Sequence, residues 1–402
     1  MTGYTVSFPD GRNVTLRGAV TLEIAGVSTS VLPRLCFAAA HVVMRPEYAA
    51  LGHSPSNPGS PASIADHVDW DATMEVRRRI GAYGFGIAEA MDTAQRFEIG
   101  WPAARRLIEE CGQLGLARGF VAGAGCDQLT DADAGRTARI DAIVEQVGMI
   151  QSAGGTAVIL PQPWLCAEGF GEEDWVAFYA DIVRQVEGPL VVHWLGEMFH
   201  AGMRGAFPGR SFRRIMALDP AKIRACKLSL LDASFEVEVR DALRADGQLV
   251  LTGDDFHFGA LMIGDGTGFA DETVAFGSAD VGMGAFSHAL LGVLDAVAAP
   301  VSRALQALAA GDFELCRVQM NACEEFGRIA FEAPTSNYKT GLALCAWLNG
   351  WQEEFLMPNG AEQSRDLDHI RRLVEAADRA GVLEDPGRAA QRLRKLIAAR
   401  SR

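Results

Sequence analysis

The chain has 402 residues, of which 49% are apolar and 22% charged, and its 51 Asp and Glu outweigh its 37 Lys and Arg to give a formal net charge of −14. This length allows two or three domains, or one α/β barrel with added helices, and the composition is that of a globular protein with a large core. The net negative charge and the lack of a basic tract argue against nucleic acid and anionic membranes as partners. We expect a reduced, cytoplasmic protein, because the eight cysteines form no CxxC pair and the sequence shows no signal-like start and no long apolar run.

The first part of the chain reads as a small β unit. Residues 4–8 and 13–17 alternate apolar and polar side chains around Pro9-Asp10-Gly11, which predicts a hairpin, and residues 19–24 read as a third strand. We expect this unit, residues 1–30, to pack outside the main domain. Residues 44–71, rich in Pro, Gly, Ser and His, are long for a loop and are predicted to form a lid over a site.

Eight short apolar segments, each followed by helical sequence, then predict a TIM barrel over residues 31–309. The predicted strands are residues 34–43, 84–88, 119–122, 156–160, 190–195, 223–227, 248–252 and 280–284, with a long helix beginning near Phe286. An open doubly wound sheet is the runner-up, but Gly123-Ala-Gly125 lacks the third glycine of a dinucleotide-binding motif. Residues 310–402 read as four helices, which predict a C-terminal helical subdomain and a homo-oligomer, either dimer or tetramer.

Barrel enzymes carry their chemistry on the loops that follow the carboxyl ends of the strands. Several polar residues fall at those predicted ends, and we expect them to share one cavity that binds a small molecule. They are His41, Glu89, Asp92, Asp127, Gln162, His193, Lys227, Asp254, Asp255 and His257.

Lys227 stands out among them because the chain has only four lysines beside 33 arginines. It ends an apolar strand, where desolvation would lower its pKa and leave some neutral amine to attack a carbonyl. The alternative interpretation is a strand-end lysine held in a salt bridge.

The order of these features resembles the dihydrodipicolinate synthase / N-acetylneuraminate lyase superfamily of Schiff-base aldolases over roughly residues 34–350. Residues 223–227 resemble the strand that bears the imine-forming lysine, and Gly253-Asp254-Asp255 resembles the sequence after the seventh strand. Residues 119–125 and 188–194 are similar to the third and fifth strands of that family. More specifically, residues 69–75 (DWDATME) and 83–95 (YGFGIAEAMDTAQ) resemble an uncharacterised branch, the domain-of-unknown-function family 993.

Two positions depart from the pattern of the superfamily. Its fifth strand normally ends in a tyrosine that relays protons, and the matching residue here is His193, which could shuttle protons near neutral pH. Its Thr-Thr-Gly turn, which binds the carboxylate of the keto acid, is matched here by Ala90-Met91-Asp92. A carboxylate at position 92 would repel that of a substrate by about 1–4 kcal/mol, which favours a neutral, sugar-derived keto compound over pyruvate. Asp92 could instead only cap the following helix.

The resemblance therefore implies a class I aldolase or lyase that needs no cofactor beyond a covalent lysine imine. Lys227 would form the imine, His193 would move the proton and Asp255 would be a second candidate for that role; the remaining polar residues named above would bind substrate. Tyr338 and Lys339 fall near a region that lines the subunit edge in relatives and receive no catalytic role.

Two other functions stay open at this point. In a metal-dependent sugar lyase, epimerase or isomerase, His41, Asp92, His193 and His257 would bind one divalent ion, although no HxH or HExxH spacing supports it. The last hypothesis is a non-catalytic barrel that binds a metabolite.

Overall fold

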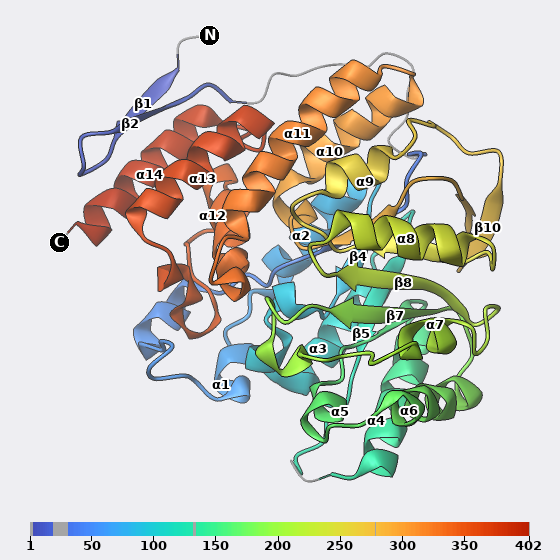
Figure 1. Ribbon diagram of the computed structural model, residues 1–402. Coiled ribbons are helices and arrows are strands. Elements are labelled where there is room, and N and C mark those ends of the chain that lie inside the picture. The colour runs from blue at the N-terminus through green and yellow to red at the C-terminus, as the bar shows by residue number, and fades with distance from the viewer. Residues whose placement is uncertain (1–2, 19–30, 132–133, 278, 402) are drawn as a thin grey trace.

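A computed structural model describes residues 3–18, 31–131, 134–277 and 279–401. Eight parallel strands close into a barrel in the order β12-β3-β4-β5-β6-β7-β8-β9 (Figure 1). The strands are β3 (Cys36–Ala39), β4 (Gly86–Glu89), β5 (Phe120–Ala124), β6 (Thr156–Ile159), β7 (Leu190–Leu195), β8 (Ile223–Ser229), β9 (Leu249–Thr252) and β12 (His288–Leu291). The predicted TIM barrel is thereby confirmed.

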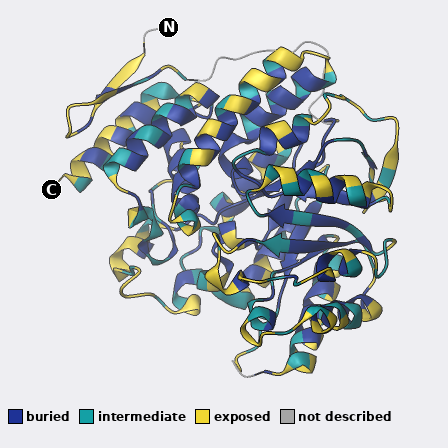
Figure 2. Ribbon diagram, in the orientation of Figure 1, coloured by how far each residue is buried: buried dark blue, intermediate teal, exposed yellow. Residues whose placement is uncertain are grey.

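Helices surround the barrel and cover the outer face of its strands, which are almost wholly buried (Figure 2). Two of them begin with an aspartate whose side chain accepts a hydrogen bond from the first helical turn, Asp69 for α2 and Asp232 for α8. The helices are α2 (Trp70–Ala82), α3 (Arg96–Gly112), α4 (Arg136–Ser152), α5 (Pro163–Ala167), α6 (Glu172–Gln185), α7 (Ser211–Met216), α8 (Ala233–Arg244), α9 (Phe258–Ile263) and α10 (Leu294–Ala309).

Side chains alternate between the barrel interior and the helix-covered face, because successive residues of a strand point to opposite sides. In β8, Ala225 belongs to the interior cluster, whereas Cys226 and Leu228 pack with the surrounding helices. Lys227, two positions after Ala225, therefore points into the barrel.

The eighth barrel strand was predicted at residues 280–284, and this prediction is wrong. That segment overlaps β11 (Ala279–Gly282), which pairs antiparallel with β10 (Thr273–Phe276) in a separate hairpin. The hairpin covers the amino-terminal end of the barrel, where the ring of Phe276 lies 6.1 Å from that of Phe37. The true strand, β12, was included in the long helix predicted near Phe286, because a short apolar run has no periodicity that separates strand from helix.

The predicted lid, residues 44–71, is partly helical, with a 3-10 helix η1 (Pro46–Leu51) and α1 (Pro61–Ala65). Its apolar side chains Met44, Tyr48 and Val68 form a buried cluster with α2 and α3. The Tyr48 hydroxyl also accepts a hydrogen bond of 2.9 Å from the backbone of Asn359. The segment is thus packed against the fold instead of lying over a cavity as predicted.

The C-terminal region is helical, as predicted, and packs beside α10 (Figure 1). Every residue of its central helix α12 is buried. The hairpin of β1 (Tyr4–Ser7) and β2 (Asn13–Leu16) lies on α13 and α14, and the predicted strand at 19–24 falls outside the described residues. The helices are α11 (Phe313–Ala330), α12 (Tyr338–Asn349), α13 (Leu367–Ala380) and α14 (Pro386–Arg400).

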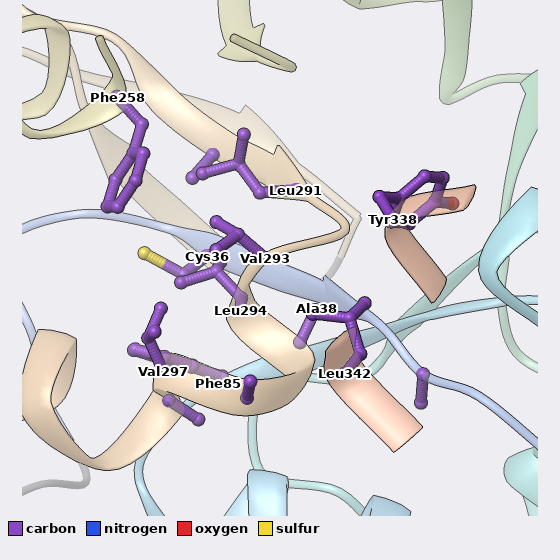
Figure 3. Close-up of a cluster of buried hydrophobic side chains, with 14 of the residues drawn as sticks. Cys36, Ala38, Phe85, Phe258, Leu291, Val293, Leu294, Val297, Tyr338 and Leu342 are labelled. Carbon is purple, nitrogen blue, oxygen red and sulfur yellow. The ribbon is translucent and has the colours of Figure 1, made fainter. Parts of the chain in front are cut away.

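The apolar contact between barrel and C-terminal region is shown in Figure 3, where Cys36, Ala38 and Leu291 of two strands face residues of α10 and α12. Tyr338 stands at the edge of this cluster, with its hydroxyl directed away from it (Figure 3). None of the helices in the described ranges combines the length and the apolar character that crossing a bilayer would require.

Candidate active site

A cavity of about 560 Å³ opens at the carboxyl-terminal end of the barrel. Its wall contains strand residues, the loops that follow the strands, and two residues from the C-terminal region, Phe331 and Tyr338. Of the predicted site residues, the cavity brings together Asp92, Asp127, Gln162, His193, Lys227 and Asp255.

Lys227 reaches the cavity from the middle of β8, at the same level as His193 of β7 and Leu251 of β9. Gly253 makes room for it, because a Cβ at that position would lie 3.0 Å from Lys227 Cε and 2.8 Å from the carbonyl oxygen of Leu228. Within the described part of the chain, Lys227 Nζ forms no hydrogen bond or ion pair, so the salt-bridged alternative does not apply. Burial lowers the pKa of Lys227, and the Asp255 and Asp92 carboxylates oppose this only in part.

His193 and Asp255 flank the lysine. His193 Nε2 lies 3.2 Å from Ser229 Oγ, and its buried Nδ1 has no hydrogen-bond partner in the described structure. Burial and the nearby Lys227 charge hold the pKa of His193 well below its ordinary value, so the ring is neutral at neutral pH. Asp255 Oδ1 accepts a 2.9 Å hydrogen bond from the Val293 backbone, and burial raises the pKa of Asp255. The pKa values of Lys227 and Asp255 thus move toward each other, each mainly because of burial.

Asp92 enters the cavity wall from the 3-10 helix η2 (Asp92–Ala94), and two residues of α12 hold it. Lys339 Nζ donates to Asp92 Oδ1 at 2.8 Å, and the Tyr338 hydroxyl donates to Asp92 Oδ2 at 3.1 Å. The Asp92 side chain is 55% exposed and that of Lys339 10%. Burial alone would lower the pKa of Lys339, but the Asp92 carboxylate outweighs it and raises that pKa. Asp92 is therefore held by an ion pair behind the cavity and does not merely cap a helix.

Tyr338 is a cavity residue that the sequence did not indicate as functional. Its hydroxyl lies 2.8 Å from Thr93 Oγ1, and its ring stacks on Phe331 with centroids 4.3 Å apart. Gly292, at the end of β12, leaves space for that ring, since a Cβ there would lie 2.9 Å from a Tyr338 ring carbon. The scarcity of lysine, which singled out Lys227, applied equally to Lys339 and could have indicated this region.

Gln162 and Asp127 line the cavity but are engaged with the protein. Gln162 Nε2 donates to the Leu160 carbonyl at 2.7 Å. The buried guanidinium of Arg96 donates to both carboxylate oxygens of Asp127, at 2.8 and 2.9 Å, and also binds Gln146. This ion pair fixes the start of α3 beside the cavity.

Four predicted site residues lie outside the cavity, which corrects the prediction. Glu89 follows Ala88, an interior residue, so it points outward to Arg77 of α2, which donates to both of its carboxylate oxygens at 2.8 Å. His41 is buried between Asp295, at 2.5 Å, and Gln352, at 3.1 Å.

The other two, Asp254 and His257, bind each other in the turn after β9. Asp254 accepts hydrogen bonds from the backbone of Phe256 and His257, and its Oδ2 lies 2.8 Å from His257 Nδ1. Neither Asp254 nor His257 lines the cavity.

The four residues considered for a metal site, His41, Asp92, His193 and His257, are therefore not gathered at one point. Within the ranges that the structure describes, no three His, Cys, Asp or Glu side chains are placed to hold a metal ion. The predicted metal site is not formed.

Comparisons with solved structures agree with this architecture. Dihydrodipicolinate synthase from Acinetobacter baumannii, chloride-inhibited and complexed with pyruvate, matches with a TM-score of 0.58 and 14% identity over 88% of this chain and 100% of that chain. The synthase from Aquifex aeolicus gives 0.58 and 14% over 88% and 99%. N-acetylneuraminate lyase from Mycoplasma synoviae gives 0.54 and 11% over 86% and 97%. At these identities the likeness establishes the fold.

Comparison with curated protein sequences gave no significant match. The family model described as "Protein of unknown function (DUF993)" matches residues 10–401. This span includes every strand of the barrel and all the helices around it, and it confirms the resemblance seen in residues 69–75 and 83–95. The protein belongs to the DUF993 family and has the barrel fold of the dihydrodipicolinate synthases and N-acetylneuraminate lyases.

Proposed function

We propose that this protein is a class I lyase, in which Lys227 forms an imine with the carbonyl of a small keto compound. The observation that carries the proposal is the Lys227 amine, which reaches into the cavity, has no ion-pair partner in the described structure, and has a pKa lowered by burial. Such an amine is partly neutral near physiological pH and can attack a carbonyl carbon. The solved structures of the same fold support the proposal, since they include proteins titled synthase and lyase.

The proposed reaction begins when the neutral amine adds to the ketone, takes up a proton and loses water to give an iminium ion. Breaking the bond between the carbons alpha and beta to the iminium then leaves an enamine, because the iminium accepts the electron pair of that bond. The enamine takes up a proton, and water hydrolyses the resulting iminium to release the product. In the carbon–oxygen case, the alpha carbon first loses a proton to give the enamine, which then expels the beta hydroxyl group as water. Neutral His193, at the level of Lys227 in the barrel wall, is the proposed proton carrier, and Asp255 is the second candidate.

We propose a neutral donor, such as a sugar-derived hydroxyketone, in place of pyruvate. Asp92 presents a half-exposed carboxylate to the cavity, which disfavours a second carboxylate beside it. Lys339 balances this charge from behind but is itself only 10% exposed. Asp92 and Gln162 would then accept hydrogen bonds from the hydroxyl groups of the donor.

Reduction of the imine tests this function. Treatment with dihydroxyacetone and borohydride should add the mass of the reduced donor to the peptide that contains Lys227 and inactivate the protein. Lys222 is the matched control, because its amine is held by the carbonyls of Val183 and Val186. Lys222→Met should still be trapped, whereas Lys227→Met should not.

Turnover of a keto compound with Lys227 unmodified after borohydride treatment would refute the imine. The non-catalytic alternative makes a different prediction, in which Lys227→Met binds its ligand as tightly as the wild type and no ketone is turned over. The expected homo-oligomer stays a prediction that sedimentation would test.

A further inference from the structure

The cavity continues beyond Lys227 into a part with a different character. Lys227 and His193 lie within strands, whereas a second group of lining residues lies on the segments that follow the strands and is therefore nearer the mouth. This outer group, here called the apolar mouth, consists of Phe97, Leu129, Trp164, Phe199 and Met203.

Charged residues also reach the outer part of the cavity, but they are bound to other parts of the protein. Arg96 and Asp127 form their buried pair, and Arg139 donates to the Ala134 carbonyl while its guanidinium lies 5.0 Å from the centroid of the Trp164 ring. Their charges are thus offset or covered by aromatic surface. The faces left for a ligand are mainly hydrocarbon and aromatic.

Among the described residues, Phe97 is the most exposed of the large apolar side chains, with 62% of its surface open to solvent. Its position is fixed by the preceding residue, Arg96, whose guanidinium is buried and bound to the carbonyls of Ala90 and Gly123. A phenylalanine held in water at the rim of a cavity gains free energy when a ligand covers it. Exposed aromatic surface at this place therefore points to an apolar ligand group.

We propose that the substrate has two unlike parts, a small neutral ketone bound at Lys227 and an apolar, ring-sized group bound at the apolar mouth. This inference rests on the proposed function and specifies its second reactant as an apolar or aromatic aldehyde. In cleavage, the bond between the carbons alpha and beta to the iminium breaks, its electrons form the enamine, and the beta hydroxyl loses its proton to His193 as the aldehyde leaves. A cavity of about 560 Å³ lies within the range of roughly 300–1,000 Å³ usual for ligands of that size.

Two methyl ketones that share a β-hydroxyl group test the proposal. They are 4-hydroxy-4-phenylbutan-2-one, which carries a ring, and 1-deoxyfructose, which carries hydroxyl groups instead. With borohydride present, the phenyl ketone should label half of Lys227 at a concentration roughly tenfold or more below that needed for the polyol, because burial of a ring contributes about that factor.

Phe97→Ser should raise the concentration required for the phenyl ketone several-fold and leave the polyol unchanged. Phe313→Ser is the matched control, since Phe313 is also half-exposed but lies at the start of α11 outside the cavity. Labelling by the polyol at an equal or lower concentration, or a Phe97→Ser variant that labels like the wild type, would overturn the apolar mouth.

A carbonyl-free probe separates this inference from the imine. 4-Phenylbutan-2-ol cannot be trapped, and we expect it to quench the fluorescence of Trp164, with the response lost in Trp164→Phe and weakened in Phe97→Ser. Binding of this alcohol without labelling of Lys227 by either ketone would refute the imine and keep the apolar mouth. Labelling by both ketones without binding of the alcohol would do the reverse.

Discussion

The ion pair between Asp92 and Lys339 should respond very differently to loss of its two partners. In Asp92→Ala, Lys339, whose side chain is only 10% exposed beside Asp92, loses its hydrogen-bond acceptor in the described structure. Breaking a buried pair in this way costs about 3–5 kcal/mol, and the partial exposure of Asp92 reduces our expectation to about 2–4 kcal/mol. In Lys339→Met, the Asp92 carboxylate is left 55% exposed and can be hydrated, so the cost should stay below about 1 kcal/mol.

Urea unfolding at pH 7, followed in parallel by circular dichroism and fluorescence, measures both costs. The double variant Asp92→Ala/Lys339→Met should be nearly as stable as Lys339→Met, because the unpaired ammonium is gone. Equal destabilisation by the two single variants, or a double variant whose cost is their sum, would refute the reasoning. The pair would then be an ordinary surface contact with no bearing on how the cavity wall is held.

Three further predictions concern the cavity and its surroundings. Asp92→Asn removes the charge that faces the donor, so the pyruvate concentration needed to label Lys227 with borohydride should fall at least about fivefold relative to the wild type. An unchanged concentration would contradict the donor assignment. Only the neutral amine reacts, and burial lowers the pKa of Lys227, so the labelling rate should rise with pH and level off well below the ordinary lysine pKa of about 10.4. Asp255→Asn removes a carboxylate that raises the pKa of Lys227, so it should shift the midpoint of this rise to lower pH. Labelling rates measured from pH 5 to 10 would show both effects. Burial raises the pKa of Glu236 from 4.5 to about 8, so between these pH values the folded protein keeps a proton that the unfolded chain releases. The free energy of unfolding should therefore fall over this pH range by up to roughly 4 kcal/mol. Glu236→Gln should lack this fall in urea unfolding, and an equal fall in wild type and variant would contradict the assignment.

The fold could be predicted from the sequence because seven of the barrel strands are short apolar runs bounded by helical periodicity. The eighth could not, since His288–Leu291 merges with the apolar sequence of α10, while residues 280–284 alternate like a strand but belong to a hairpin. Tertiary contacts, here the packing of Phe276 on Phe37, decide which strand segments pair with one another, and the local sequence pattern does not.

The site could be predicted where the register of the strands decided it. Three predicted residues follow an interior strand residue by an even number of positions, and all three reach the cavity. They are Lys227 in β8, His193 in β7 and Asp255 after β9. Glu89 was predicted from its place at a strand end alone, but it directly follows the interior residue Ala88 and therefore points outward to Arg77.

The contribution of α12 could not have been predicted from the strands at all, because a local sequence pattern does not show that a helix more than 240 residues away reaches Asp92.

The contact between α12 and Asp92 affects how the protein works. Tyr338 and Phe331 belong to the region predicted as a separate subdomain, yet they form part of the cavity wall, and Lys339 holds the Asp92 carboxylate in that wall. Any movement of α12 relative to the barrel would therefore change both the shape of the cavity and the electrostatic environment of Lys227, whose pKa already depends on Asp92. The proposed imine chemistry thus depends on the packing of the C-terminal helices as well as on the barrel that carries the lysine.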